Sequence, residues 1–256
     1  MKNKTKLFLC FVAISLFGAL SAQAQEAENE GVARVVHITP VEGHDEALIK
    51  AITEYHHWVA KFDGHHEYQW YEILTGPDTG TYIARTGNHD WADFDAQNDW
   101  QKEAGEFFEK NVAPHIQDAD IHMTDDMRSF RHWPESFDGY SHFQVENWYV
   151  HNGKMGQFRK GLKKIVDTLK AANYPYYWGF FSVESGAYGN QIQIVSANKG
   201  WSGMSESDPS FYDIMSAELG GQEAFDAFMS EWSSTFKTGG NQMVRYMSDA
   251  SDYGKD

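Results

Sequence analysis

The chain has 256 residues, of which 41% are hydrophobic and 15% aromatic, so it can bury a sizeable core and is not a wholly disordered chain. Its 37 acidic and 21 basic residues give a formal net charge of −16, which argues against nucleic acid or an anionic membrane as a partner, because both require clustered Lys and Arg. This length fits one large domain or two small ones.

A targeting segment is predicted at the start of the chain. Three lysines fall within the first six residues, Leu7 to Leu20 is mostly apolar, and Ala22-Gln23-Ala24 has the small-x-small pattern of a signal peptidase site. We therefore expect a signal peptide at residues 1–24 and a protein exported to the periplasm or the extracellular space. The alternative is an N-terminal membrane anchor, but the apolar stretch is short for a span of about 20 residues.

Cysteine is confined to this segment. Cys10 follows Leu9 near the beginning of the apolar run, where a lipidated cysteine is not expected. The mature chain then has no cysteine, which excludes disulfides, thiolate catalysis and thiolate metal sites. No other apolar run is long enough to cross a membrane, so we expect a soluble product without membrane insertion after cleavage.

The rest of the chain contains an internal repeat. When residues 35–94 are moved forward by 110 positions, apolar positions fall on apolar positions and several residues coincide. The identical pairs are Gly43 and Gly153, Gly76 and Gly186, Asn88 and Asn198, and Trp91 and Trp201. Further along, Met127-Arg128 best matches Met243-Val244, a shift of 116, so we expect an insertion in the second copy at residues 205–221.

Both copies predict the same order of elements, β-α-β-β-α-β, which is the ferredoxin-like unit. In chain order, the first copy predicts a strand at 32–39, a helix, strands at 68–74 and 81–86, a helix at 93–112 and a strand at 126–132. The buried stripe of its first helix is Leu48, Ile52, Tyr55 and Val59. The second predicts a strand at 142–150, a helix with the stripe Met155, Phe158, Leu162, Ile165 and Leu169, strands at 176–183 and 191–196, a helix at 223–236 and a strand at 242–247.

The expected domain organisation follows from this repeat. We predict a first ferredoxin-like unit at residues 25–133, a linker at 134–140 and a second unit at 141–256. Each unit has both helices on one face of an antiparallel sheet, which leaves an apolar face too large for a monomeric domain to expose. We therefore predict an α+β fold in which the two units pair sheet to sheet.

This layout resembles the dimeric α/β-barrel superfamily over residues 32–250. The likeness rests on the tandem units, the glycine before the first helix, the glycine in the turn between the second and third strands, and the tryptophan after the third strand. It is closest in general form to the antibiotic-biosynthesis-monooxygenase-type domain. That superfamily includes cofactor-free monooxygenases, haem-degrading enzymes, haem peroxidases, chlorite dismutases and binding proteins, so the resemblance implies a fold and leaves the function open.

Polar residues occupy equivalent positions on the two first strands. His37 and Asn147 are 110 residues apart, and each needs a hydrogen-bond partner if its face of the strand is buried. A ligand could be that partner; the alternatives are solvent or a bond across the sheet. In haem-degrading relatives an asparagine on the first strand is part of the site, which Asn147 resembles, but the helix-two histidine of those enzymes has no counterpart in the second copy.

Aromatic residues supply the other candidate ligand contacts. Trp91 and Trp201 each follow a third strand and could roof a cleft between helices and sheet. Tyr71 and Phe181 lie on the second strands and could line a stacking pocket. For both pairs the alternative is packing in a core or between the sheets.

Histidine is unevenly distributed, with ten of the twelve histidines in the first copy or at its edge. Imidazole binds metals and haem iron, but no HExxH or similarly spaced set is present, so we predict no metal site and keep haem as an alternative. GxSxG, P-loop and GxGxxG motifs are also missing, which leaves hydrolase, NTPase and dinucleotide-binding functions unsupported.

The leading functional expectation is an exported protein that binds a small molecule in a helix–sheet cleft, with His37 or Asn147 as the polar contact and without a cofactor. One alternative is an oxidoreductase, either a cofactor-free monooxygenase or a haem enzyme. Another is a structural or interaction module without catalysis. The chain could also form a homo-oligomer.

Overall fold

The computed structural model describes residues 31–95 and 98–254. The predicted signal peptide at residues 1–24, with Cys10 inside it, lies outside these residues. Among the described residues, no helix combines the length and the apolar character needed to cross a bilayer.

The first unit contains four strands and two α-helices in the predicted order. They are β1 (Val32–Pro40), α2 (Asp45–Val59), β2 (Gln69–Ile73), β3 (Tyr82–His89), α3 (Gln101–Asn111) and β4 (Ile116–Asp126), with the short 3-10 helices η1 (Trp91–Phe94), η2 (Ala113–His115) and η3 (Arg128–Phe130). Helix α2 buries Leu48, Ile52 and Val59 along one face, as their spacing predicts. Its acidic first turn, Asp45 and Glu46, favours the positive end of the helix dipole.

The second unit repeats this order with one additional helix. Its elements are β5 (His142–Val150), α4 (Met155–Ala171), β6 (Tyr177–Ser185), β7 (Asn190–Asn198), α5 (Phe211–Leu219), α6 (Gln222–Ser233) and β8 (Phe236–Tyr246), with the 3-10 helices η4 (Trp201–Met204) and η5 (Asp249–Ser251). Helix α5 lies within residues 205–221, where the insertion was expected.

The predicted last strands were wrong in position. The strand expected at 126–132 is β4, which ends at Asp126, and the strand expected at 242–247 begins at Phe236. Strand β4 is hard to recognise from its acidic sequence, because its first half is exposed and lacks a buried apolar pattern. The strand is held in place by backbone pairing with β1. The two last strands correspond by a shift of 120 and not 116, so that Met127 matches Met247. The helix expected at 93–112 is shorter and begins at Gln101.

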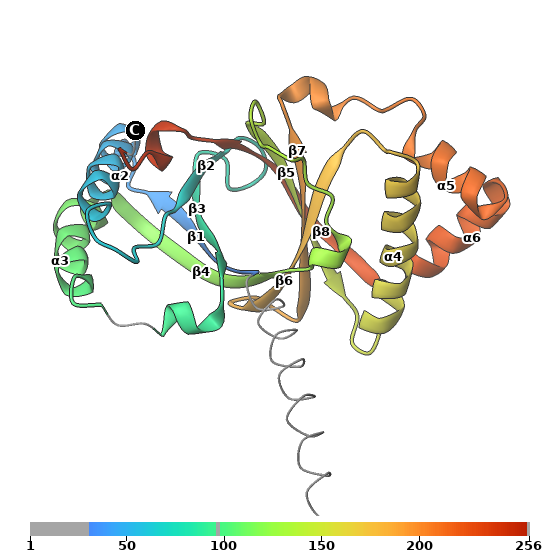
Figure 1. Cartoon of the computed structure of the whole chain (residues 1–256), viewed down its shortest axis with the longest axis horizontal. Helices are drawn as coiled ribbons and strands as arrows, with labels where there is room; N and C mark the ends of the chain where they lie inside the picture. The colour runs from blue at the N-terminus through green and yellow to red at the C-terminus, as the bar shows by residue number, and fades with distance from the viewer. Residues whose placement is uncertain (1–30, 96–97, 255–256) are drawn as a thin grey trace, which may run out of the picture.

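The eight strands close into one antiparallel barrel. Their order is β1-β3-β2-β8-β5-β7-β6-β4, so each unit contributes four neighbouring strands and the units join through β2–β8 and β4–β6. Helices α2 and α3 cover the barrel on one side, and α4, α5 and α6 cover it on the other (Figure 1). The predicted pairing of the two sheets is therefore achieved through their edges, and the faces without helices turn toward the barrel interior.

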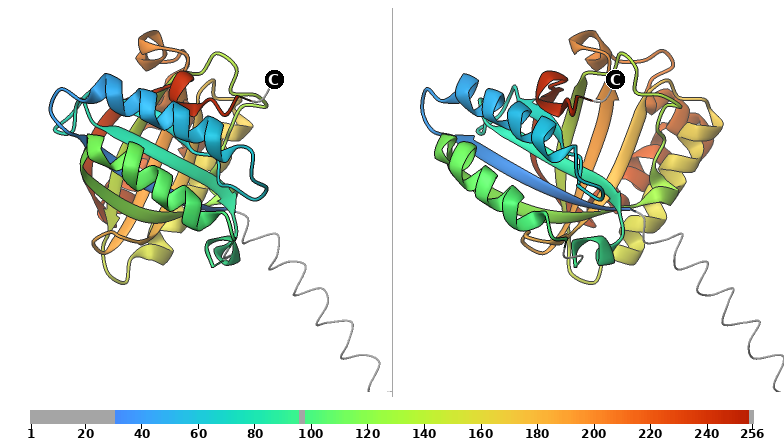
Figure 2. Two further views of the ribbon diagram at one scale, coloured as in Figure 1. Left: turned by 90° about the vertical axis from the view of Figure 1, so that its left-hand side faces the viewer. Right: turned by 60° about the vertical axis from the view of Figure 1, so that its left-hand side comes forward.

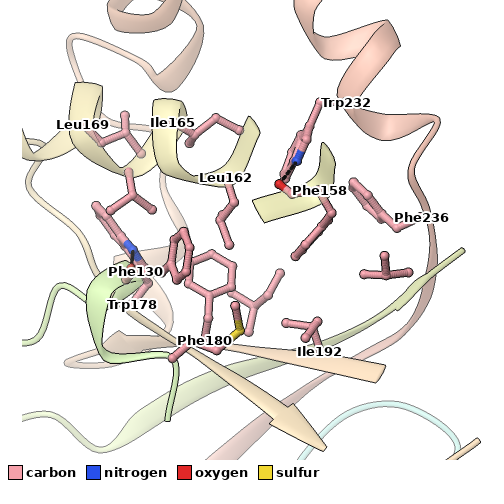
Figure 3. Packing of buried hydrophobic residues seen from close by; sticks show 14 of the residues in the cluster. Phe130, Phe158, Leu162, Ile165, Leu169, Trp178, Phe180, Ile192, Trp232 and Phe236 are labelled. Carbon is pink, nitrogen blue, oxygen red and sulfur yellow. Dashed lines mark hydrogen bonds between the residues drawn. The ribbon is translucent and has the colours of Figure 1, made fainter. Parts of the chain in front are cut away.

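Each unit has a core between its helices and its sheet. In the second unit, Trp232 on α6 lies over Phe158 on α4 with a ring-centroid distance of 5.8 Å (Figure 3). The Trp232 indole N–H donates to the Phe158 carbonyl oxygen at 3.0 Å. Gly161 makes this contact possible, because a Cβ there would lie 2.2 Å from Cδ1 of Trp232. The glycine in α4 is thus explained by the close approach of the indole.

The segment after the last strand of each unit crosses to the other unit. Met127 and Phe130 follow β4 but belong to the core of the second unit. Ala250 belongs to the core of the first unit, and η5, which contains it, lies beside α2 (Figure 2). Farther along, the Tyr253 ring stacks on His56 of α2 with a centroid distance of 4.2 Å. Each core is therefore completed by residues from the other half of the chain.

Candidate functional site

A cavity of about 560 Å³ occupies the barrel interior, and we call it the barrel cavity. Strands of both units supply its apolar wall residues Val35, Ile83, Val145, Val195 and Val244, and its aromatic wall residues Tyr71, Phe143, Phe181 and Tyr246. Side chains alternate between the two faces of a strand, so Val35 and His37 of β1 face the cavity whereas Val36 and Ile38 pack under the helices.

The predicted linker forms part of the cavity wall. Trp133, Phe137 and Tyr140 all line the barrel cavity. The Trp133 indole lies against Gly179 of β6, where an added Cβ would be 2.1 Å from Cζ2 of the indole. The segment that joins the units is therefore held against the barrel by a glycine that gives the tryptophan room.

Two imidazoles lie against each other inside the barrel. The rings of His37 and His122 are stacked with a centroid distance of 5.2 Å, and Nε2 of His122 lies 3.4 Å from Nε2 of Gln193. Burial lowers the pKa of His37, and burial together with the neighbouring His37 lowers the pKa of His122 to about 4. Both rings are therefore neutral near pH 7, and His37 can accept a hydrogen bond or a proton from a molecule in the cavity.

The charged residues that line the cavity are the ion pair Asp126–Arg131, Arg85 and Asp138. Asp126 accepts a hydrogen bond from Nη1 of Arg131 through its Oδ2. Arg85 of β3 faces the same cavity, with its guanidinium carbon 5.5 Å from the centroid of the Phe181 ring. Burial raises the pKa of Tyr71, so its hydroxyl group stays protonated. This hydroxyl donates a hydrogen bond to Oε1 of Gln69 at 3.2 Å.

Three of the six predicted contact residues meet in this cavity, namely His37, Tyr71 and Phe181. Asn147 does not line the cavity, and its Oδ1 accepts a hydrogen bond from Nε2 of Gln191 at 2.8 Å. Trp91 and Trp201 lie in η1 and η4 with 44% and 55% of their surface exposed, and neither lines the cavity.

The barrel cavity does not lie in a cleft between helices and sheet, where the site was predicted. Large side chains fill that space in both units, for example Trp148, which lies 4.5 Å from Phe236 between ring centroids. The free volume lies on the opposite face of each sheet, because only barrel closure brings those faces together. Sequence reasoning also missed Arg85, although its position two residues after the inward-facing Ile83 places it on the same face of β3.

Four other histidines of the first unit lie in two pairs. Nδ1 of His44 is 3.1 Å from Nδ1 of His115, and the rings of His66 and His89 are 4.4 Å apart. Within residues 31–95 and 98–254, no group of three or more His, Cys, Asp or Glu side chains is arranged to hold a metal ion. These pairs therefore give no support to a metal centre.

The helix–sheet spaces do not fit a haem. In the second unit, the rings of Trp148, Phe158, Trp232 and Phe236 occupy this space, and helices α4, α5 and α6 contain no histidine. In the first unit, His56 of α2 is turned into the core against Tyr253. His57, next to it, is on the surface with Nε2 3.4 Å from Oδ2 of Asp252. In the part of the chain that the structure describes, neither helix–sheet space thus has an axial histidine beside room for the haem plane.

Comparison with known proteins supports the fold. No protein-family model matches the sequence, and no curated protein sequence matches it. Similar solved structures include an anthrone oxidase-like protein, with a TM-score of 0.54 and 10% identity over 86% of this chain and 93% of that chain. A candidate monooxygenase from Lactobacillus acidophilus NCFM has a TM-score of 0.51 and 10% identity over 85% and 93% of the two chains. A chlorite dismutase variant from Candidatus Nitrospira defluvii has a TM-score of 0.53 and 7% identity over 92% and 100%. The predicted dimeric α/β-barrel fold is confirmed.

Proposed function

We propose that the protein binds a small, mostly apolar organic molecule in the barrel cavity. The observation that carries this proposal is the cavity itself, because about 560 Å³ is in the size range of ligand pockets. Eight strands make a barrel whose interior is either filled by side chains or left with room for one small ligand. Export, which residues 1–24 predict, would place the binding outside the cytoplasm.

The chemistry of the cavity wall supports this proposal. Ligand pockets are lined mainly by apolar and aromatic side chains with a few polar groups that orient the ligand. The barrel cavity combines valine, isoleucine and aromatic residues with polar and charged ones, among them His37, Arg85 and Gln193. Trp133 in the wall provides an intrinsic fluorescent reporter of binding.

Filling the cavity is expected to abolish binding. Val195 of β7 lines the cavity, so Val195→Trp should weaken the affinity for the neutral dye N-phenyl-1-naphthylamine by at least about tenfold, since the added indole takes the volume the dye needs. Titration followed by dye fluorescence measures the change. Tyr188→Trp is the matched control, because Tyr188 is 93% exposed in the turn after β6 and the same new side chain there should leave the affinity unchanged.

Circular dichroism and thermal unfolding of both variants serve to check that they are folded. Equal dye affinity for the wild type and a folded Val195→Trp variant would mean that the dye binds elsewhere, and the proposed function would be wrong. The same conclusion holds if the wild type binds no dye and shows no change in tryptophan fluorescence.

A second candidate function is the oxygenation of a bound aromatic molecule without a cofactor. The neutral imidazole of His37 favours it, because such a base can take a proton from an acidic C–H or O–H group in the cavity. The names of two structural neighbours, an anthrone oxidase-like protein and a candidate monooxygenase, are consistent with it. In this reaction the deprotonated substrate reduces O₂, one oxygen atom enters the substrate as a carbonyl, and the other leaves as water.

His37→Ala is expected to slow such a reaction by about 100-fold, the usual contribution of a positioned general base. Oxygen consumption with anthrone as the substrate measures the rate. Asn147→Ala is the control, because Asn147 does not line the cavity and should leave the rate unchanged. If the wild type consumes no oxygen above the uncatalysed rate while it still binds the neutral dye, oxygenation is excluded for this substrate and binding remains the function.

A further inference from the structure

Arg85 is the polar group of the barrel cavity that is hardest to explain as part of the fold. It projects from the middle of β3 into the barrel interior, where charged side chains are costly to bury. Gly87, two residues along the same strand, makes room for its guanidinium, because an added Cβ at Gly87 would lie 2.6 Å from Nη1 and 2.8 Å from Nη2. The arginine thus lies along its own strand over a glycine.

The positive charge of Arg85 is not matched by a bonded partner. Among residues 31–95 and 98–254, no hydrogen bond or ion pair involves its side chain, whose guanidinium lies over the ring of Phe181 and is attracted electrostatically by Asp126. Asp126 faces the same cavity, but its Oδ2 already binds Arg131. Because a guanidinium inside a protein is unfavourable when its donors make no hydrogen bond, Arg85 points to an anion that comes from outside the chain.

The surroundings of Arg85 define what kind of anion fits. A guanidinium presents planar, paired donors that match a carboxylate. The adjoining walls, including Phe181, Tyr71 and Phe143, are aromatic and suit a flat ring. The two arginines and two aspartates that line the cavity already balance in charge, so a monoanion adds less net charge to it than a phosphate dianion does.

We propose that the ligand of the barrel cavity is an aromatic monocarboxylate whose carboxylate is bound by Arg85 beside Phe181. This inference rests on the proposed binding function and adds the chemical class of the ligand. His37 and Gln193 line the same cavity and can hydrogen-bond a hydroxyl group carried by the ring.

The test compares an acid with its neutral ester. Calorimetric titration of the mature chain with 2-naphthoate and with methyl 2-naphthoate separates the carboxylate from the ring system. The wild type should bind the acid at least about tenfold more tightly than the ester. Arg85→Met should weaken naphthoate binding by about 30-fold and change ester binding by less than about twofold. The naphthoate affinity of Arg85→Lys should lie between those of the wild type and Arg85→Met.

Arg34→Gln is the matched control for the loss of one positive charge. Arg34 lies on β1, beside β3, but its guanidinium packs over Phe94 outside the barrel cavity at 4.8 Å from the ring centroid. This variant should bind both compounds as the wild type does. A loss of naphthoate affinity equal to that of Arg85→Met would mean that net charge, and not the Arg85 site, attracts the acid, and would overturn the inference.

Thermal unfolding without ligand distinguishes a binding role from a structural one. Arg85→Met removes a charged group that makes no hydrogen bond within the described residues, so its melting temperature should equal or exceed that of the wild type. A clearly lower melting temperature of Arg85→Met, together with loss of its binding to both compounds, would show that Arg85 stabilises the fold and would overturn the inference. If both compounds bind equally well to the wild type and to Arg85→Met, the ligand class is wrong but the binding function stands. If the wild type binds neither compound, and also fails to bind the neutral dye, the proposed function itself is wrong.

Discussion

Replacing Trp232 with alanine is expected to lower the free energy of unfolding by about 4 kcal/mol, near the upper end of large-to-small core substitutions. The indole is 6% exposed and contacts the rings of Trp148, Phe158 and Phe236 with centroid distances of 5.4, 5.8 and 5.0 Å. The substitution also removes the hydrogen bond to the Phe158 carbonyl oxygen. Urea unfolding followed by far-UV circular dichroism measures the loss.

The same indole determines whether a second substitution raises or lowers the free energy of unfolding. Gly161→Ala alone should lower the free energy of unfolding by about 2 kcal/mol, because the new methyl group overlaps the indole. In the Trp232→Ala background the overlap is gone, and the same change should raise the stability by about 1 kcal/mol, the helix preference of alanine over glycine. If Gly161→Ala has the same effect in both backgrounds, the glycine is not there to admit the tryptophan.

The second large effect is a loss of stability in mild acid. His56 is 2% exposed, and burial lowers its pKa from 6.5 to about 4. The unfolded chain takes up the proton first, so the contribution of His56 to stability is complete above about pH 6.5. It falls as the pH drops from 6.5 to 4, where the folded protein is protonated too. A difference of about two and a half pKa units corresponds to about 3 kcal/mol.

His56→Phe should remove this contribution while it keeps a ring against Tyr253. Near pH 7 the variant should be as stable as the wild type or more so, because Nδ1 of His56 is buried without a hydrogen-bond partner. Urea unfolding at several pH values should show an acid-induced loss that is smaller by about 3 kcal/mol in the variant. An equal loss in the two proteins would place the acid sensitivity in other groups.

The repeat could be predicted from sequence because it depends on local patterns that occur twice. The matched glycines, such as Gly43 and Gly153, both have positive φ values, which glycine adopts without strain. The buried stripes of α2 and α4 recur at helical spacing. Strand β4 could not be predicted in the same way, because its first half is exposed and polar and so has no alternation of apolar and polar residues.

The position of the barrel cavity was harder to predict than the identity of some of the residues that line it. His37 could be singled out because a polar residue in the middle of a strand needs a partner. Its cavity arises from the pairings β2–β8 and β4–β6, which join residues more than fifty positions apart and have no local signature. The same closure brings Arg85 of the first half near Phe181 of the second.

The exchange of segments between the two cores also constrains how the chain can fold during its synthesis. Ala250 and Tyr253 are synthesised long after α2, yet they complete the packing around it. The first unit therefore cannot reach its final packing until the second unit has been synthesised, so folding of the first unit on its own, the usual order for multidomain chains, is incomplete here. Cutting the gene at the midpoint would leave each fragment without the residues that close its own interior, so the two halves are interdependent parts of one cooperative structure.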